Sequence, residues 1–236
     1  MLDTIKDLLS RAEHIAVLTG AGVSTASGIP DFRSSEGLWT EDRSREELMS
    51  RQFFDRSPEE FWYHYKSIFR LKLLQNYGPN AVHRFLFDLE QRGKHVDVVT
   101  QNVDGLHTAA GNTNVLEYHG SLQTATCPDC LQTYPLDKIL AEDVPSCSCG
   151  SIPKPDVVLF GDMIPFHDEA EKVVRQADVT LVLGTSLSVM PFNMLPMAAG
   201  GVKVLINNQP TDKDYIFDYC IHDDLSAVID QLNRNF

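Results

Sequence analysis

The stretch AVLTGAGVSTASGIPDFRS, residues 16–34, has the pattern of a buried strand followed by a glycine-rich turn. Small residues at Gly20, Ala21 and Gly22 let backbone N–H groups approach a pyrophosphate closely. The dinucleotide fingerprint G-x-G-x-x-G needs a third glycine where this chain has Thr25, and an aromatic residue and an arginine follow where a helix should run. The stretch predicts either a nucleotide-binding loop of its own kind or a plain tight turn.

The rest of the chain predicts an α/β fold with a doubly wound parallel sheet. Apolar runs without alternation indicate strands that are covered on both faces. Helical patterns lie between these runs, which is typical of parallel strands joined by helices. The expected strands are 15–20, 96–102, 115–120, 157–161, 179–186 and 202–208, and the expected helices include 80–93, 167–178 and 224–235.

Two stretches interrupt the alternation of strands and helices. Residues 36–78 contain a helical pattern with a dense aromatic face at 57–74, and residues 121–156 contain little apolar periodicity. We expect a Rossmann-like large domain built from 1–35, 79–120 and 156–236. The helical insertion 36–78 and a module at 121–155 are expected to form a smaller domain.

Four of the five cysteines lie in that module as two close pairs, Cys127 with Cys130 and Cys147 with Cys149. This spacing is typical of a structural zinc site with four thiolates. Disulfides and unrelated buried thiols are the alternatives, and the single residue between Cys147 and Cys149 makes a tighter chelate than usual. Cys220 has no partner in the pattern and is expected to be a small buried hydrophobe.

Composition limits the classes of partner. The net charge of −13 argues against binding nucleic acid, although it would tolerate lysine-rich peptide segments. Residues 1–14 have the pattern of an amphipathic helix, and no apolar run is long enough to span a membrane. We expect a cytoplasmic protein.

Polar residues follow several of the expected strands, where open α/β sheets bind their ligands. Turn and capping roles are the alternative for each group, and a lone histidine such as His119 is more often structural. Because several such groups occur together, catalysis is favoured. The residues are Gln101, Asn102 and Asp104 in TQNVDGLH, His119 in EYHG, Gly184, Thr185 and Ser186 in LGTSLSVMP, and Asn207 in LINNQPT.

These motifs, in this order, resemble the sirtuins, the NAD-dependent protein lysine deacylases. GAGVSTASGIPDFRS, TQNVDGLH, EYHG, the paired cysteines, KPDVVLFGD and GTSLSVMP carry the resemblance, which runs from about residue 10 to the C-terminus. The chain looks most like the compact bacterial members. The resemblance implies NAD and one structural Zn2+ as cofactors, an acyl-lysine peptide as substrate, and a cleft between the two domains.

The resemblance also implies roles for individual residues. His119 is the implied general base, with Asn102 and Asp104 beside it, and Val158, Phe160, Gly161 and Val189 hold the peptide as an added strand. Phe32 covers the nicotinamide side and Arg33 contacts the phosphates. The implied NAD contacts are Gly20, Ala21, Gly22, Thr25, Phe32, Arg33, Gln101, Val103, Asp104, His119, Gly184, Thr185, Ser186, Asn207 and Asp224.

The implied reaction begins when the acyl oxygen attacks C1′ of the nicotinamide ribose and nicotinamide leaves. His119 then accepts a proton from a ribose hydroxyl, and water releases free lysine and O-acyl-ADP-ribose. ADP-ribosyl transfer and a non-catalytic NAD or ADP-ribose sensor are the other readings. A dehydrogenase is disfavoured by the broken fingerprint, and the chain is expected to be a monomer.

Family members that remove succinyl or malonyl groups carry a tyrosine and an arginine three residues apart. This chain has Tyr63 and Lys66 at that spacing. A lysine lacks the guanidinium fork that binds a carboxylate bidentately, and an ordinary solvated lysine is the alternative. We therefore expect deacetylation, with desuccinylation or demalonylation as the alternative.

Overall fold

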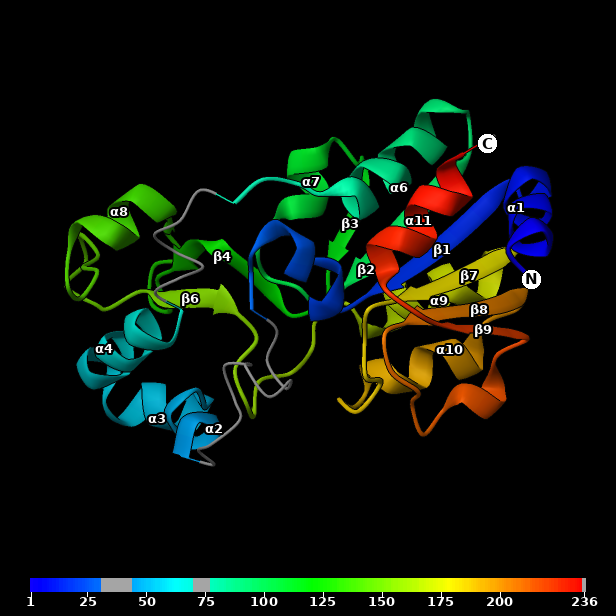
Figure 1. Cartoon of the computed structure of the whole chain (residues 1–236). Helices are drawn as coiled ribbons and strands as arrows, with labels where there is room; N and C mark the ends of the chain where they lie inside the picture. Colours follow the sequence, from blue (N-terminus) through cyan, green and yellow to red (C-terminus); the bar gives the residue numbers. More distant parts are fainter. Residues whose placement is uncertain (31–43, 70–76, 235–236) are drawn as a thin grey trace.

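The structure is a computed structural model that describes residues 1–30, 44–69 and 77–234 (Figure 1). Its main feature is a six-stranded parallel sheet of order β3-β2-β1-β7-β8-β9. The strands are β1 (His14–Thr19), β2 (His95–Thr100), β3 (Asn114–Glu117), β7 (Val179–Leu183), β8 (Val202–Asn207) and β9 (Tyr219–His222). The order changes direction beside β1, as in Rossmann-like folds, and the predicted fold class is confirmed.

Helices cover both faces of this sheet. One face carries α1 (Leu2–Arg11), α6 (Ala81–Gln91) and α11 (Leu225–Asn233), and the other carries α9 (His167–Gln176) and α10 (Leu195–Ala198) (Figure 1). This double cover explains why β7 is buried along its whole length and reads as an unbroken apolar run. The amphipathic helix predicted at the start of the chain is α1, which buries Ile5 and Leu9.

A second, three-stranded antiparallel sheet has the order β5-β4-β6. Its strands are β4 (Gly120–Thr126), β5 (Thr133–Pro135) and β6 (Lys154–Val157), and α8 (Leu136–Ala141) directly follows β5. The helices α2 (Ser44–Leu48), α3 (Arg51–Arg56) and α4 (Pro58–Ile68) come from an earlier part of the chain. Aromatic side chains of α3 and α4, among them Phe61 and Trp62, pack with β4 and β6 in a hydrophobic cluster of their own. These elements lie at the left of Figure 1.

One predicted strand was wrong, and strands outside the predicted runs were missed. The run 157–161 is not a strand of the parallel sheet, because only Val157 belongs to a strand, β6, which pairs antiparallel with β4. The run is apolar because Val157 and Leu159 belong to the hydrophobic cluster formed with the aromatic residues of α3 and α4, here called the aromatic cluster. A turn at Gly161, with φ +91°, ends the extended segment. Strand β9 was not predicted. It contains Cys220, which is half-buried and packs against the core rather than lying fully inside it.

The short helix α7 (Leu106–Ala110) and four 3₁₀ turns complete the described structure: Ala21–Val23, Thr25–Ser27, Phe192–Met194 and Asp214–Ile216. Among the described residues, no helix combines the length and apolarity that a membrane span requires.

Candidate active site

The residues predicted after the strands lie along one edge of the parallel sheet. Parallel strands all point their carboxyl ends to the same edge, so the loops after β1, β2, β7 and β8 are brought together there. Hydrogen bonds join the loop after β1 directly to the end of β7 and the loop that follows it. The amide N–H of Gly20 donates to the oxygen of Leu183 at 3.1 Å, and that of Gly22 donates to the oxygen of Gly184 at 2.9 Å.

The glycines of the first and third loops make this contact possible. A Cβ on Gly22 would lie 2.9 Å from the Cα of Gly184, and a Cβ on Gly184 would lie 2.6 Å from the nitrogen of Val23. Gly184 also has φ +58°, a conformation that glycine adopts at little cost. Gly22 and Gly184 are therefore needed for loop-to-loop packing, whether or not a nucleotide is bound. Thr25 is exposed, and its hydroxyl donates to the oxygen of Gly22 at 3.0 Å.

A buried hydrogen-bond network links the first two loops. The side-chain amide of Asn102 donates to the oxygen of Gly20 at 3.0 Å and to Ser24 Oγ at 3.1 Å, and the Ser24 hydroxyl donates to Asp104 Oδ2 at 2.8 Å. The other carboxylate oxygen of Asp104 accepts from the N–H of Leu106 at 3.0 Å. Asn102 and Asp104 are thus brought together, and Ser24 is the residue between them.

Gln101 and Val103 form the neighbouring part of the edge. The side chain of Gln101 donates to Thr185 Oγ1 at 3.0 Å, which joins the loop after β2 to the loop after β7. Val103 is buried and belongs to the aromatic cluster of the second sheet. The two predicted residues therefore connect the site to different parts of the molecule.

His119 lies between the two sheets, after β3 and directly before Gly120 of β4. It is half-buried, and its ring lies near those of Tyr118 and Phe192, with centroids 5.2 and 6.5 Å away. Burial lowers the pKa of His119 below its ordinary value of 6.5, while a hydrogen bond to the backbone of Gln101 acts in the opposite direction. The imidazole is therefore mostly uncharged at neutral pH, as a general base must be.

The residues predicted for the adenosine half are more dispersed. Ser186 is exposed and its hydroxyl lies 2.8 Å from that of Ser188, while Asn207 donates to the oxygen of Gln209 at 2.7 Å. Asp224 is the N-cap of α11 and accepts from the N–H of Ala227 at 2.9 Å. That capping role explains Asp224 without a ligand. Phe32 and Arg33 lie outside the described residues, and Ala21 is half-buried in the first turn.

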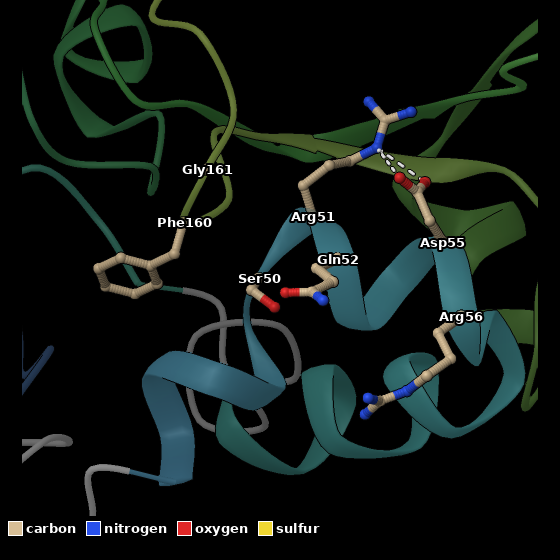
Figure 2. A pocket seen from close by; sticks show the side chains of 7 residues that line it. All are labelled: Ser50, Arg51, Gln52, Asp55, Arg56, Phe160 and Gly161. Carbon is tan, nitrogen blue, oxygen red and sulfur yellow. Dashed lines mark hydrogen bonds and ion pairs between the residues drawn. The ribbon is translucent and has the colours of Figure 1, made fainter.

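The predicted peptide-binding segment pairs with two other parts of the chain. The N–H of Val158 donates to the oxygen of His119 at 2.9 Å, and Phe160 forms a parallel bridge with Ser50. Figure 2 shows Phe160 and Gly161 beside α3, where they line an open pocket of about 620 Å³ with Ser50, Arg51, Gln52, Asp55 and Arg56. Val189 is half-buried in the loop after β7.

The structure gives Lys66 a role other than binding an acyl group. Its ammonium donates to the oxygen of Ile139 at 2.6 Å and also to the oxygen of Glu142, so it caps the carboxyl end of α8. Tyr63, on the same helix, is 73% exposed. The ammonium of Lys66 is therefore bonded to the backbone rather than simply solvated, and its contact with an acidic acyl group stays an untested alternative.

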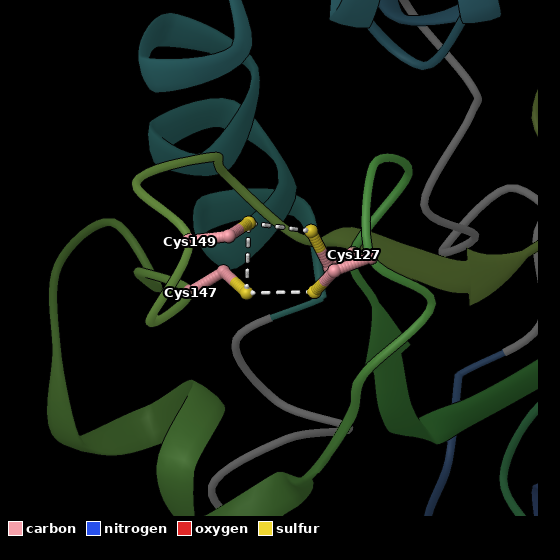
Figure 3. A group of neighbouring side chains, drawn as sticks. Cys127, Cys147 and Cys149 are labelled. Carbon is pink, nitrogen blue, oxygen red and sulfur yellow. Dashed lines mark hydrogen bonds between the residues drawn. The ribbon is translucent and has the colours of Figure 1, made fainter.

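The sulfur atoms of the four cysteines, which lie in loops beside the second sheet, are all close to one another. Figure 3 shows Cys127, Cys147 and Cys149 of this group. The sulfur atoms of Cys127 and Cys149 lie 3.5 Å apart. The Cys130–Cys147 and Cys147–Cys149 sulfur pairs are each 3.3 Å apart. A tetrahedral zinc with Zn–S bonds of about 2.3 Å needs sulfurs about 3.8 Å apart, so a small expansion suffices. The residues fit a structural zinc ion, and the Cys-x-Cys spacing is no obstacle.

Two further polar residues support the site but were not predicted. His107 and His83 are buried with ring centroids 4.7 Å apart; His107 Nε2 lies 3.1 Å from the Thr19 hydroxyl, and His83 Nδ1 accepts from the N–H of Asn80. His107 stands in TQNVDGLH, where its position in a strand-end motif was the available signal. His83 lies in a helix pattern that gave no signal.

Comparison with known proteins finds a matching family model and similar sequences that cover nearly the whole chain. A sequence model described as the Sir2 family matches residues 20–191. An NAD-dependent protein deacetylase of Chromobacterium violaceum is 46% identical over 235 residues, which cover 98% of this chain and 96% of that protein. One of Bacillus subtilis is 47% identical over 233 residues, covering 94% of each.

Solved structures agree. A Sir2 structure with deacetylated p53 peptide and 3′-O-acetyl ADP-ribose has a TM-score of 0.86 and 34% identity, covering 99% of this chain and 96% of that one. Sir2Tm bound to a propionylated peptide has a TM-score of 0.85 and 33% identity, covering 99% and 97%.

Proposed function

Because the chain belongs to the Sir2 family, we propose that it is an NAD-dependent protein lysine deacetylase that releases nicotinamide and O-acetyl-ADP-ribose. The observation that carries the proposal is the position and protonation of His119. A half-buried, largely uncharged imidazole lies beside the strand-end loops and next to the segment proposed to bind peptide.

The chain's own groups divide the work of the reaction. NAD supplies a ribose carbon that becomes electrophilic as nicotinamide departs. His119 accepts the proton of a ribose hydroxyl at an imidazole nitrogen. Asn102 and Asp104 are both hydrogen-bonded to Ser24, so they fix the loop after β2 against the loop after β1. These bonds support a positioning role for both residues.

The remaining proposed contacts follow the edge of the sheet. Gln101 and Val103 are proposed to face the nicotinamide half, and Thr185, Ser186 and Asn207 the adenosine half. Asp224 is proposed to contact the adenine end in addition to capping α11. Phe32 and Arg33 keep their proposed roles on the strength of the motif. Val158, Phe160, Gly161 and Val189 are proposed to receive the peptide backbone.

The acyl group is proposed to be acetyl. A succinyl or malonyl carboxylate needs a cation in the pocket. The ammonium of Lys66 instead donates to two backbone oxygens, that of Ile139 in α8 and that of Glu142 directly after it. This contact supports deacetylation over the desuccinylase alternative. ADP-ribosyl transfer and an NAD sensor stay as outcomes of the test below.

We also propose a domain organisation, a location in the cell, a class of partner and an oligomeric state. The separate hydrophobic clusters support a large domain of 1–35, 79–120 and 156–236 and a small domain of 36–78 and 121–155. The bacterial origin of the similar deacetylases supports a cytoplasmic location. The charge of −13 supports lysine-rich protein partners and no nucleic acid, and we propose a monomer.

The test is mass spectrometry of matched acetyl-lysine and succinyl-lysine peptides incubated with the protein, with and without NAD. Three proteins are compared: the wild type, His119→Ala, and His95→Gln as a matched control, since His95 starts β2 at the other end of the sheet. We expect NAD-dependent loss of acetyl in the wild type and the control. His119→Ala should lose at least about 100-fold in rate, as removal of a general base does.

Other outcomes would replace the proposal. Succinyl loss exceeding acetyl loss would identify a desuccinylase. Transfer of ADP-ribose to the peptide without loss of acetyl would identify a transferase, and NAD binding without any reaction would identify a sensor. Acetyl loss that survives in His119→Ala would leave the deacetylase but remove His119 as its base.

A further inference from the structure

Three side chains with metal-binding atoms gather at the amino ends of β1 and β2. His14 is the first residue of β1, His95 is the first residue of β2, and Asp97 lies two residues after His95. The parallel register pairs His14 with His95 and Ala16 with Asp97. Side chains alternate along a strand, so His95 and Asp97 share one face of the sheet, and the register puts His14 on that face too.

The donor atoms of the three side chains are already close together. Asp97 Oδ2 lies 2.7 Å from His14 Nε2 and 3.0 Å from His95 Nε2, and all three atoms lie within 4.8 Å of one another. The two rings meet edge to face with centroids 4.6 Å apart. A tetrahedral zinc with ligand bonds of about 2.0–2.1 Å needs donor atoms about 3.3 Å apart, so small side-chain shifts would admit the ion.

The surroundings favour a cation. The side chains of His14 and Asp97 are only 18% and 19% exposed, whereas that of His95 is 57% exposed, so two ligands are held by packing and the third opens to solvent. Within the described ranges, the ion pairs of Asp97 are with these two histidines and with no lysine or arginine. The carboxylate of Asp178 accepts from the N–H of His14 at 3.0 Å and adds negative charge nearby.

We propose that His14, His95 and Asp97 form a second metal site, distinct from the four cysteines. Two imidazole nitrogens and one carboxylate oxygen suit divalent ions of the zinc, cobalt and nickel class, and three protein ligands leave a position for water. Because its ligands lie on adjacent strands, the ion ties the starts of β1 and β2 together. Their other ends carry Gly20 and Gln101, so the metal is away from the proposed active site.

The direct test is calorimetric titration of the full chain with Zn2+, using protein without a polyhistidine tag and with its cysteine-bound zinc measured beforehand. We expect one further equivalent in the wild type and a rise in Tm as the site fills, since an ion bound only by the folded state stabilises that state. His95→Gln and Asp97→Asn should each weaken this second equivalent at least about tenfold. His222→Gln is the matched control, because His222 pairs with a single carboxylate, that of Asp214, at 2.8 Å.

A second readout separates this site from the cysteines and from folding. In NMR spectra, the ring protons of two histidines should shift on the second equivalent, and these shifts should vanish in His95→Gln while its deacetylation persists. No second equivalent in the wild type would overturn the proposal. So would a second equivalent that persists unchanged in both His95→Gln and Asp97→Asn.

Discussion

Because Gly184 has no side chain, the loop after β7 can pack closely against the loop after β1, at the edge of the sheet proposed to bind NAD. The substitution of Gly184 by alanine adds strain from φ +58° and a contact of 2.6 Å with the backbone nitrogen of Val23. Gly93 has φ +84° but open space around its Cβ position, so Gly93→Ala isolates the strain. We expect Gly93→Ala to cost about 1 kcal/mol and Gly184→Ala at least about 2 kcal/mol more, measured by urea unfolding.

Gly184→Ala should also weaken NAD binding by displacing the loop after β7, whereas Gly93→Ala should leave it unchanged. Equal unfolding costs for the two variants would show that the loops separate easily and that the close packing at Gly22 contributes little.

The protonation of His119 predicts how the rate depends on pH. Burial lowers the pKa of the imidazole below 6.5, and the base acts only when it is uncharged. Activity is therefore lost as pH falls through this lowered pKa, so the acidic limb of kcat/KM for the acetyl peptide should lie below pH 6.5. The residual rate of His119→Ala should lack this limb. A midpoint clearly above 6.5 would contradict the environment described for this residue.

At the scale of elements, Lys66 joins α4 to the end of α8. Removal of its ammonium leaves the oxygens of Ile139 and Glu142 without that donor, so Lys66→Met should destabilise the chain by about 1–3 kcal/mol. Lys172→Met on the exposed side of α9 is the control and should cost less than about 0.5 kcal/mol. Urea unfolding gives both values.

The same contact predicts the result of Lys66→Arg. If the side chain caps α8, arginine there should not raise succinyl removal relative to acetyl removal in the peptide assay. A gain in succinyl removal would show that position 66 reaches the acyl group after all.

The packing of α6 against α7 predicts a pH-dependent stability. Burial lowers the pKa of His83 to about 4 and that of His107 to about 3, with the neighbouring His83 adding to the shift at His107. Between these values and 6.5, the unfolded chain binds protons that the folded chain excludes, so stability falls as the pH falls. From pH 7 to pH 5 we expect a loss of about 2 kcal/mol per histidine.

Urea unfolding at both pH values measures this loss, and His107→Gln should remove about half of the difference between them. A stability that does not change over this range would mean that the two rings take up protons in the folded chain as they do in the unfolded chain, which would contradict their burial.

The elements also show what a sequence can predict. The runs that became β1, β2, β7 and β8 were identified because strands covered on both faces are apolar throughout. The same criterion misassigned 157–161, since an apolar segment that packs into the aromatic cluster has the same composition. At the site, the partners of Ser24 and of Lys66 could not be predicted, because a hydroxyl or an ammonium acquires its partner only when distant segments meet.

At the scale of the whole molecule, His119 connects the two sheets. It follows β3 of the parallel sheet and precedes β4 of the antiparallel sheet, and its backbone oxygen accepts from Val158 just after β6. The cysteines lie at the far end of that antiparallel sheet, with Cys127 directly after β4. The zinc module and the proposed base are therefore linked through β4 and β6.

This linkage predicts that zinc removal inactivates the protein before the large sheet unfolds. The ion would hold together the loops that carry the two cysteine pairs beside a sheet of three short strands, and its removal leaves those loops without their cross-link. With a strong chelator, hydrogen exchange should accelerate first in 120–157, while β1, β7 and β8 stay protected, and deacetylation should fall together with protection of β4. Added Zn2+ should restore both in the wild type but not in Cys127→Ser. If both sheets lost protection together, the hydrophobic clusters of the two sheets would form one cooperative unit, and the proposed division into two domains would have to be given up.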